Sequence, residues 1–267
     1  MKTRAITGFF FIAVLIAAVL LGPYVFIPFF TVLGVYSVYE FYKMVQTEQS
    51  TPLLWTGIFS ALAGLTVLGA VLLGFIPETS LLLAFSFAFV LYITALFRKT
   101  NSAIQDIAYT LFGLLYAAVP FGIFICLGFV TGIYNPYIPL GFLILLWTND
   151  TGAYLAGKSF GRRKLFERIS PNKTWEGFIG GLVLAVVVSL NLARYFDALL
   201  SWQWLVLALI IGSFGTLGDL VESMLKRNTG VKDSGNILPG HGGLLDRFDG
   251  LLMAAPLVYL FLKFFVF

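Results

Sequence analysis

Long apolar runs follow one another along almost the whole chain and are separated by short polar turns. Runs of roughly 20 residues match a bilayer core about 30 Å thick, and a helix satisfies its own backbone groups inside that core. Barrel strands would be shorter and would alternate in polarity. The pattern therefore predicts an all-α, polytopic integral membrane protein with about nine transmembrane helices. The predicted helices lie at residues 5–22, 24–45, 53–75, 80–97, 103–130, 137–157, 175–194, 202–226 and 246–266.

Composition supports this fold class. Of 267 residues, 59% are hydrophobic and only 11% are charged, whereas soluble domains are about half apolar. A soluble globular protein is therefore excluded. Pro120 falls inside the fifth predicted helix and is expected to kink or split it, because proline lacks the backbone donor.

The distribution of basic residues predicts the orientation of the chain. With a cytoplasmic amino terminus, most lysines and arginines lie on the cytoplasmic side, and only Arg194 and Lys263 fall outside. The polar loops 157–174 and 227–245 then both face the cytoplasm, where nucleotides and divalent cations are available. We expect residues 1–135 to form a lipid-facing scaffold and residues 136–267 to form the catalytic region.

The densest group of charged residues lies between residues 219 and 250. On a helix, Asp219, Glu222, Ser223 and Lys226 fall on one face, because offsets of three, four and seven return to nearly the same angle. The seven-residue offset places Asp219 roughly 10 Å deeper than Lys226. A carboxylate at that depth needs a basic partner or a bound cation.

Asp246 and Asp249 open the next predicted helix on one side of it. Two helix ends can bring Asp219 and Asp246 together, and a metal ion between them would offset their repulsion. Few hard oxygen ligands beside a phosphate suit Mg²⁺. The alternative is that both acids form structural ion pairs with Arg247 and Lys226.

A glycine-rich run, Pro239 to Gly243, precedes that helix. Its missing side chains let backbone N–H groups approach an anion at a helix amino terminus. Lys226, Arg227, Lys232 and Arg247 would add positive charge for several phosphates. The alternative is a flexible turn with ordinary cytoplasmic charge. For His241, contact with phosphate is favoured over proton transfer, because a phosphomonoester is largely dianionic at neutral pH without a base.

The other cytoplasmic loop carries a second polar group. Asp150 and Tyr154 share a helical face, and Lys173 and Glu176 mark the start of the next helix. Lys173 is interpreted as a ligand for anionic headgroups or phosphate, whereas ordinary cytoplasmic charge explains the basic residues at 162–164. Two roles stay open for Glu40: an acid at the membrane interface, or a distant member of the site. Gly212, Gly215 and Gly218 are expected to permit close helix packing.

The spacing of these residues resembles that of phosphatidate cytidylyltransferases, also called CDP-diacylglycerol synthases. The motif is Ser223-x-x-Lys226-Arg227, then Lys232-Asp233-x-Gly235, then Leu238-Pro-Gly-His241-Gly-Gly-Leu-x-Asp246-Arg247-x-Asp249. Residues 150–177 are also similar to the family, with Asn172 standing where a basic residue is common. The specific match covers less than half of the chain.

The resemblance implies CTP and phosphatidic acid as substrates, CDP-diacylglycerol and diphosphate as products, and dependence on Mg²⁺, with room for a second cation. The enzyme is expected to act in the bilayer without a nucleic-acid partner, and the frequency of two-fold oligomers suggests a homodimer. The absence of an organelle-targeting segment favours a bacterial plasma membrane with the site on the cytoplasmic face. A lipid kinase that uses CTP and a transporter of anionic lipids are the alternatives.

The predicted site residues fall into three groups. The catalytic residues are Asp219, Asp246, Lys226 and Arg247, of which Asp219 and Asp246 are the metal carboxylates. The residues predicted to bind the phosphates of CTP and phosphatidate are Lys173, Ser223, Lys226, Arg227, Lys232, Gly240, His241, Gly242, Gly243 and Arg247. The supporting residues are Asp150, Glu176, Glu222, Asp233 and Asp249.

Overall fold

The computed structural model describes residues 2–48, 50–237 and 242–267, with side chains from residue 7 onward. Each predicted apolar stretch coincides with helical structure. In chain order the elements are α1 (Lys2–Leu20), α2 (Pro23–Val45), α3 (Leu54–Leu72), the 3₁₀ helix η1 (Glu78–Leu82), α4 (Leu83–Leu96), α5 (Ala103–Gly113), the π-helix η2 (Leu114–Ala118), α6 (Val119–Leu127), α7 (Tyr137–Phe160), β1 (Lys164–Phe166), β2 (Ser170–Thr174), α8 (Trp175–Tyr195), α9 (Ser201–Asn228) and α10 (Leu245–Phe265).

The chain is a multi-pass membrane protein. Among the described residues, seven helices are long and apolar enough to cross a bilayer: α2, α3, η1 with α4, α5 through α6, α8, α9 and α10. In α1 the apolar part, Thr7–Leu20, is shorter, and α7 carries Asn149, Asp150 and Lys158 in its second half. The count of nine spans and the cytoplasmic amino terminus stay predictions.

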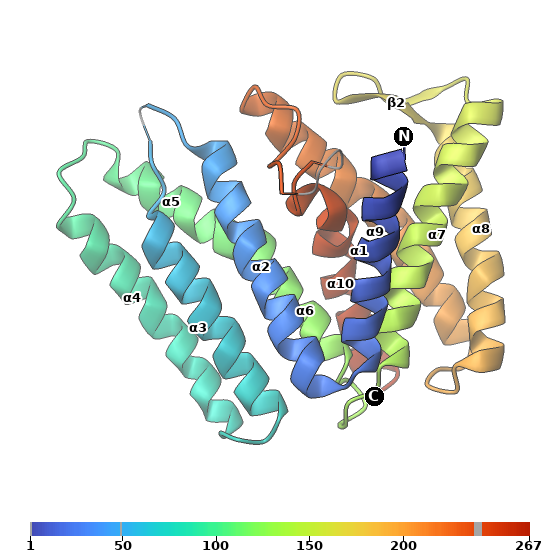
Figure 1. Cartoon of the computed structure of the whole chain (residues 1–267), viewed down its shortest axis with the longest axis horizontal. Coiled ribbons are helices and arrows are strands. Elements are labelled where there is room, and N and C mark those ends of the chain that lie inside the picture. Colours follow the sequence, from blue (N-terminus) through green and yellow to red (C-terminus); the bar gives the residue numbers. More distant parts are fainter. Residues whose placement is uncertain (1, 49, 238–241) are drawn as a thin grey trace. The chain divides into compact units, whose positions relative to one another are not determined.

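The helices group into two compact units. The first contains the described residues up to Cys126 together with Asp233–Asp246, and the second contains Leu127–Lys232 and Arg247–Phe267. In the first unit, α2, α3, α4 and α5 pack against one another (Figure 1). Buried phenylalanines join α2 to α6, since the Phe30 ring lies 4.9 Å from Phe26 and 4.8 Å from Phe124. The described flanks of the loop before α10, residues 233–237 and 242–246, also belong to this unit, although they are far from its helices in the sequence.

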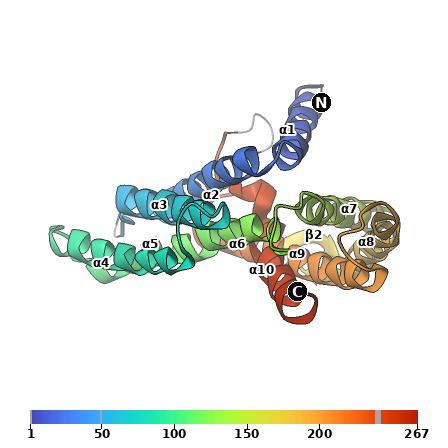
Figure 2. The same ribbon diagram turned by 90° about the horizontal axis from the view of Figure 1, so that it is seen from below.

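In the second unit, α7, α8 and α9 form the framework. Figure 2 shows α7 and α8 side by side, and both pack against α9. Glycines allow these close approaches: a Cβ at Gly152 would lie 3.0 Å from the Gly181 Cα atom. A Cβ at Gly215 would lie 2.8 Å from the Leu146 side chain of α7, and one at Gly218 would strike the Asp249 backbone of α10. The predicted packing role of the glycines on α9 is confirmed.

The loop 157–174 holds structure that the apolar pattern did not predict. β1 and β2 form a small antiparallel hairpin in which Lys164 pairs with Thr174 and Phe166 with Ser170. Thr174 then caps α8, since its hydroxyl accepts a 3.1 Å hydrogen bond from the Gly177 N–H. The two strands are only three and five residues long, so no alternation of apolar and polar residues marks them in the sequence.

The expected disruption at Pro120 is confirmed. The helical hydrogen bonding widens to a π-helix over Leu114–Ala118, directly before Val119 and Pro120. Because Pro120 cannot donate to the preceding turn, local π-helical bonding accommodates it while the helix continues into α6.

A polar cluster ties three segments of the first unit together. The fully buried Asp106 carboxylate accepts hydrogen bonds from the Ser50 hydroxyl (3.0 Å) and the Thr51 N–H (2.8 Å). Arg98 pairs with the other carboxylate oxygen at 3.3 Å and donates to the Thr51 carbonyl at 2.8 Å. The end of α4, the start of α5 and the turn before α3 are thereby held at one point.

Removing this carboxylate should destabilise the first unit. We expect Asp106→Ala to lower the free energy of unfolding by roughly 2 to 3 kcal/mol, because buried donors lose their acceptor while Arg98 stays partly hydrated. Thermal unfolding in detergent measures the loss, with the exposed Asp197→Ala as control. Equal melting temperatures for the two variants would contradict the assigned role of Asp106.

Candidate active site

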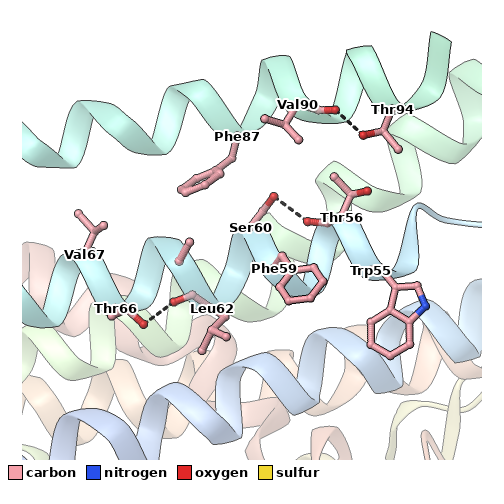
Figure 3. A pocket seen from close by; sticks show the side chains of 11 residues that line it. Trp55, Thr56, Phe59, Ser60, Leu62, Thr66, Val67, Phe87, Val90 and Thr94 are labelled. Atoms are coloured by element: carbon pink, nitrogen blue, oxygen red, sulfur yellow. Dashed lines mark hydrogen bonds between the residues drawn. The ribbon is translucent and has the colours of Figure 1, made fainter. Parts of the chain in front are cut away.

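The apolar groove between α3 and α4 has no means of binding charged substrates. It encloses about 660 Å³ and is lined by residues such as Trp55, Phe59, Ser60 and Phe87, with no charged side chain. Figure 3 shows the hydroxyl groups of Ser60, Thr66 and Thr94 bonded to carbonyls of their own helices, at 2.7 Å in each case. The candidate site is therefore sought among the charged residues of the loops and helix ends.

Asp219 is the centre of the polar cluster in the second unit. The Lys173 ammonium lies 2.5 Å from one Asp219 carboxylate oxygen, and the Ser223 hydroxyl donates to the other at 3.2 Å. The Lys173 and Asp219 side chains are 25% and 40% exposed, so solvent and small ligands reach the pair. The sequence required a partner for Asp219, and the hairpin supplies it by carrying Lys173 on β2.

Two further carboxylates belong to this cluster. Asp150 of α7 and Asp249 of α10 both lie close enough to Asp219 and to Lys173 for their charges to interact. Close helix packing places Asp249 there, since a Cβ on Gly218 would strike the Asp249 carbonyl oxygen. The sequence assigned Asp150 and Asp249 only supporting roles. The structure gathers them with Asp219 into one acidic group beside a single lysine.

The predicted polar stripe on α9 is confirmed as one continuous face. Ser223 bonds to Asp219 one turn away, and Lys226 pairs with Glu222 at 3.2 Å. The Glu222 side chain is fully buried, and that of Lys226 is only 12% exposed. Lys226 thus serves to neutralise a buried carboxylate, and its contact with phosphate stays a prediction. Asp219 forms its ion pair with Lys173 of β2.

Asp246 lies in the first unit and shapes the loop that precedes α10. One of its carboxylate oxygens accepts hydrogen bonds from the Gly243 N–H at 2.8 Å and the Ser234 N–H at 3.0 Å. Gly242 has a φ of +81°, and a Cβ there would lie 2.7 Å from the same oxygen, so glycine is required. The predicted meeting of Asp246 with Asp219, which belongs to the other unit, stays a prediction.

The remaining predicted ligands are mostly exposed. Arg227 and Lys232 follow the end of the α9 stripe, Asp233 begins the loop, and Arg247 lies in the first turn of α10. Gly240 and His241 lie outside the described residues. Because the Gly243 N–H bonds to Asp246, binding of phosphate at that amide would require this hydrogen bond to be exchanged.

Glu176 has a role in local architecture. Its carboxylate accepts hydrogen bonds from the backbone N–H groups of Arg162 and Arg163, at 3.1 to 3.3 Å. Glu176 thereby holds the beginning of the hairpin to the first turn of α8. This contact fixes the strand that presents Lys173, so the predicted supporting role has a physical basis.

The donor set fits a magnesium ion that substrate completes. Among the described residues no three His, Cys, Asp or Glu side chains converge as a ready metal cage. Mg²⁺ in phosphoryl-transfer sites is held by one or two carboxylates and by substrate phosphates, and it keeps several waters. Asp219, with Asp150 and Asp249 beside it, offers hard oxygen ligands of that type.

The chain is similar to known proteins over nearly its whole length. The family model described as "Cytidylyltransferase family" matches residues 2–265. A phosphatidate cytidylyltransferase of Staphylococcus haemolyticus is 36% identical over 98% of this chain and 99% of its own length. That of Staphylococcus aureus strain COL is 37% identical over the same shares. That of Bacillus subtilis strain 168 is 52% identical over 46% of each chain.

The close approach of α9 and α10 can be tested with a single methyl group. Gly218→Ala places a Cβ against the backbone of Asp249, so we expect a loss of roughly 1 to 3 kcal/mol in unfolding free energy. Gly64→Ala on α3 is the matched control, because nothing lies within 4 Å of its Cβ and alanine favours helix. If the melting temperature of Gly218→Ala is equal to or higher than that of Gly64→Ala, the close packing of α9 against α10 is refuted.

Proposed function

The chain belongs to the cytidylyltransferase family, and from this premise we propose that it transfers CMP from CTP to phosphatidic acid. The products are CDP-diacylglycerol and diphosphate, and the reaction serves phospholipid synthesis. The observation that carries the proposal is the likeness to relatives named phosphatidate cytidylyltransferase at 36–37% identity over nearly their whole length.

In the proposed reaction the phosphate oxygen of phosphatidic acid attacks the α-phosphorus of CTP in line. A new P–O bond forms, the bond between the α-phosphorus and the bridging oxygen breaks, and diphosphate leaves with its electron pair. A phosphate dianion needs no general base at neutral pH. The task left to the protein is to position two anionic substrates and to offset their charge.

Lys173 and Arg247 supply positive charge next to the acidic group of the second unit. Lys173 pairs with Asp219, and we propose that it turns toward a phosphate when CTP binds. Arg227, exposed in the last turn of α9, and Lys232, exposed after its end, provide further contacts for the diphosphate group. Ser223 keeps the Asp219 carboxylate oriented through its 3.2 Å hydrogen bond.

Asp219 and Asp246 are the proposed carboxylates for Mg²⁺, with Asp150 and Asp249 shaping the field around Asp219. When bound, the ion would neutralise charge on the phosphates of CTP and on the leaving diphosphate. We place the reaction at the cytoplasmic face of a bacterial plasma membrane, where CTP arrives from water and phosphatidic acid from the bilayer.

The fate of labelled phosphate tests the proposed function. Detergent-purified protein with phosphatidic acid, Mg²⁺ and CTP labelled at the α-phosphate should move label into the organic phase and release diphosphate. The γ-phosphate label should stay in water, and EDTA should stop the reaction. Transfer of the γ label would identify a lipid kinase, and absence of both transfers from folded protein would refute the proposal.

A further inference from the structure

Glu40 of α2 is a buried acid that the proposed reaction does not use. Its side chain is 2% exposed, and it lies in the first unit together with the loop 233–246. One carboxylate oxygen accepts a 2.7 Å hydrogen bond from the Leu245 N–H and a 3.4 Å hydrogen bond from the Ser234 hydroxyl. These partners are about 200 residues away along the chain, so the contact is a tertiary one.

The carboxylate lies between the two described flanks of the loop, residues 233–237 and 242–246. Gly235 on the first flank and Gly243 on the second both leave room for it, because a Cβ at either position would strike a Glu40 oxygen. The other oxygen, Oε1, is buried against Gly235 and has no hydrogen-bond partner among the described residues. Burying a carboxylate oxygen without a hydrogen-bond partner is costly, so the hydrogen bonds made by the other oxygen have to offset that cost.

Glu40 and Asp246 both accept hydrogen bonds from the two described flanks of this loop. Asp246 bonds to the N–H groups of Ser234 and Gly243, and Glu40 bonds to Ser234 and Leu245. Each carboxylate therefore joins the first flank to the second, and Glu40 also caps an amide at the amino terminus of α10. Of the two, only Glu40 comes from a helix outside the loop, so it alone anchors the loop to α2.

We propose that Glu40 is a positioning residue for CTP binding, which acts by holding both flanks of the 233–246 loop and the first amides of α10. The proposal rests on the proposed function for its substrate. Glu40 touches neither substrate nor metal in this role. Its loss would let the loop move and would place the residues around Asp246 less accurately for the phosphates.

Three variants separate positioning from simple stability. Glu40→Ala leaves the buried Leu245 N–H without its acceptor, which lowers the melting temperature, and the folded fraction should show a KM for CTP raised about tenfold or more. Glu40→Gln keeps an oxygen that accepts this hydrogen bond and should stay within about threefold of the unaltered protein. Glu48→Ala, an exposed acid shortly after α2, is the matched control and should change nothing.

Hydrogen exchange followed by mass spectrometry gives a readout that needs no substrate. Peptides covering residues 233–237 and 242–247 should exchange faster in Glu40→Ala, whereas peptides of α8 should not change. A Glu40→Ala variant with unaltered KM for CTP and unaltered exchange would overturn the proposal. A fall in melting temperature and in active fraction, with KM unchanged, would also overturn it and leave Glu40 a structural role alone.

These measurements keep the two proposals apart. If the unaltered protein fails to transfer the α label, the proposed function is wrong, while faster exchange in Glu40→Ala would still establish the anchoring of the loop. If transfer proceeds normally in Glu40→Ala at low CTP, the positioning role is wrong and the proposed function stands.

Discussion

The carboxylates of this chain lie beside helices that consist almost wholly of apolar residues, where an unpartnered charge is costly. Four of them are held by specific partners among the described residues. Asp106 is held by Arg98 and three further donors, Asp219 by Lys173 and Ser223, Glu222 by Lys226, and Asp246 by two backbone amides. These pairings fix the turns and helix ends, and one of them leaves an accessible acidic group that phosphates and cations can approach.

Much of the fold can be predicted from the sequence. Helices that cross a bilayer need long apolar runs, and a proline changes the hydrogen bonding of its own helix. The apolar runs locate every helix, and Pro120 marks the π-helical segment before α6. The hairpin at residues 164–174 does not follow, since its order comes from Glu176 binding the Arg162 and Arg163 amides, a contact that no periodicity records. The contact of Glu40 with the described flanks of the loop before α10 is equally nonlocal, because Leu245 lies 205 residues after Glu40 in the chain.

The site was predictable where its geometry is helical. The stripe from Asp219 to Lys226 follows from helical offsets, and the hydrogen bond from Ser223 to Asp219 confirms it. The partner of Asp219 was not predictable, because Lys173 reaches it from a strand in another segment. Asp249 lies in the acidic group because Gly218 has no side chain, which lets α10 approach α9 closely. The sequence does not show which two helices make this contact. The roles of the predicted ligands in catalysis remain predictions.

The central claim is that Asp219 holds the magnesium through which the protein engages CTP. Titration calorimetry of CTP binding with and without Mg²⁺, on the unaltered protein and on Asp219→Asn, tests it directly. The account predicts that Mg²⁺ tightens CTP binding about tenfold or more in the unaltered protein and has little effect in Asp219→Asn, whose melting temperature is unchanged. Equal tightening by Mg²⁺ in both proteins would contradict it.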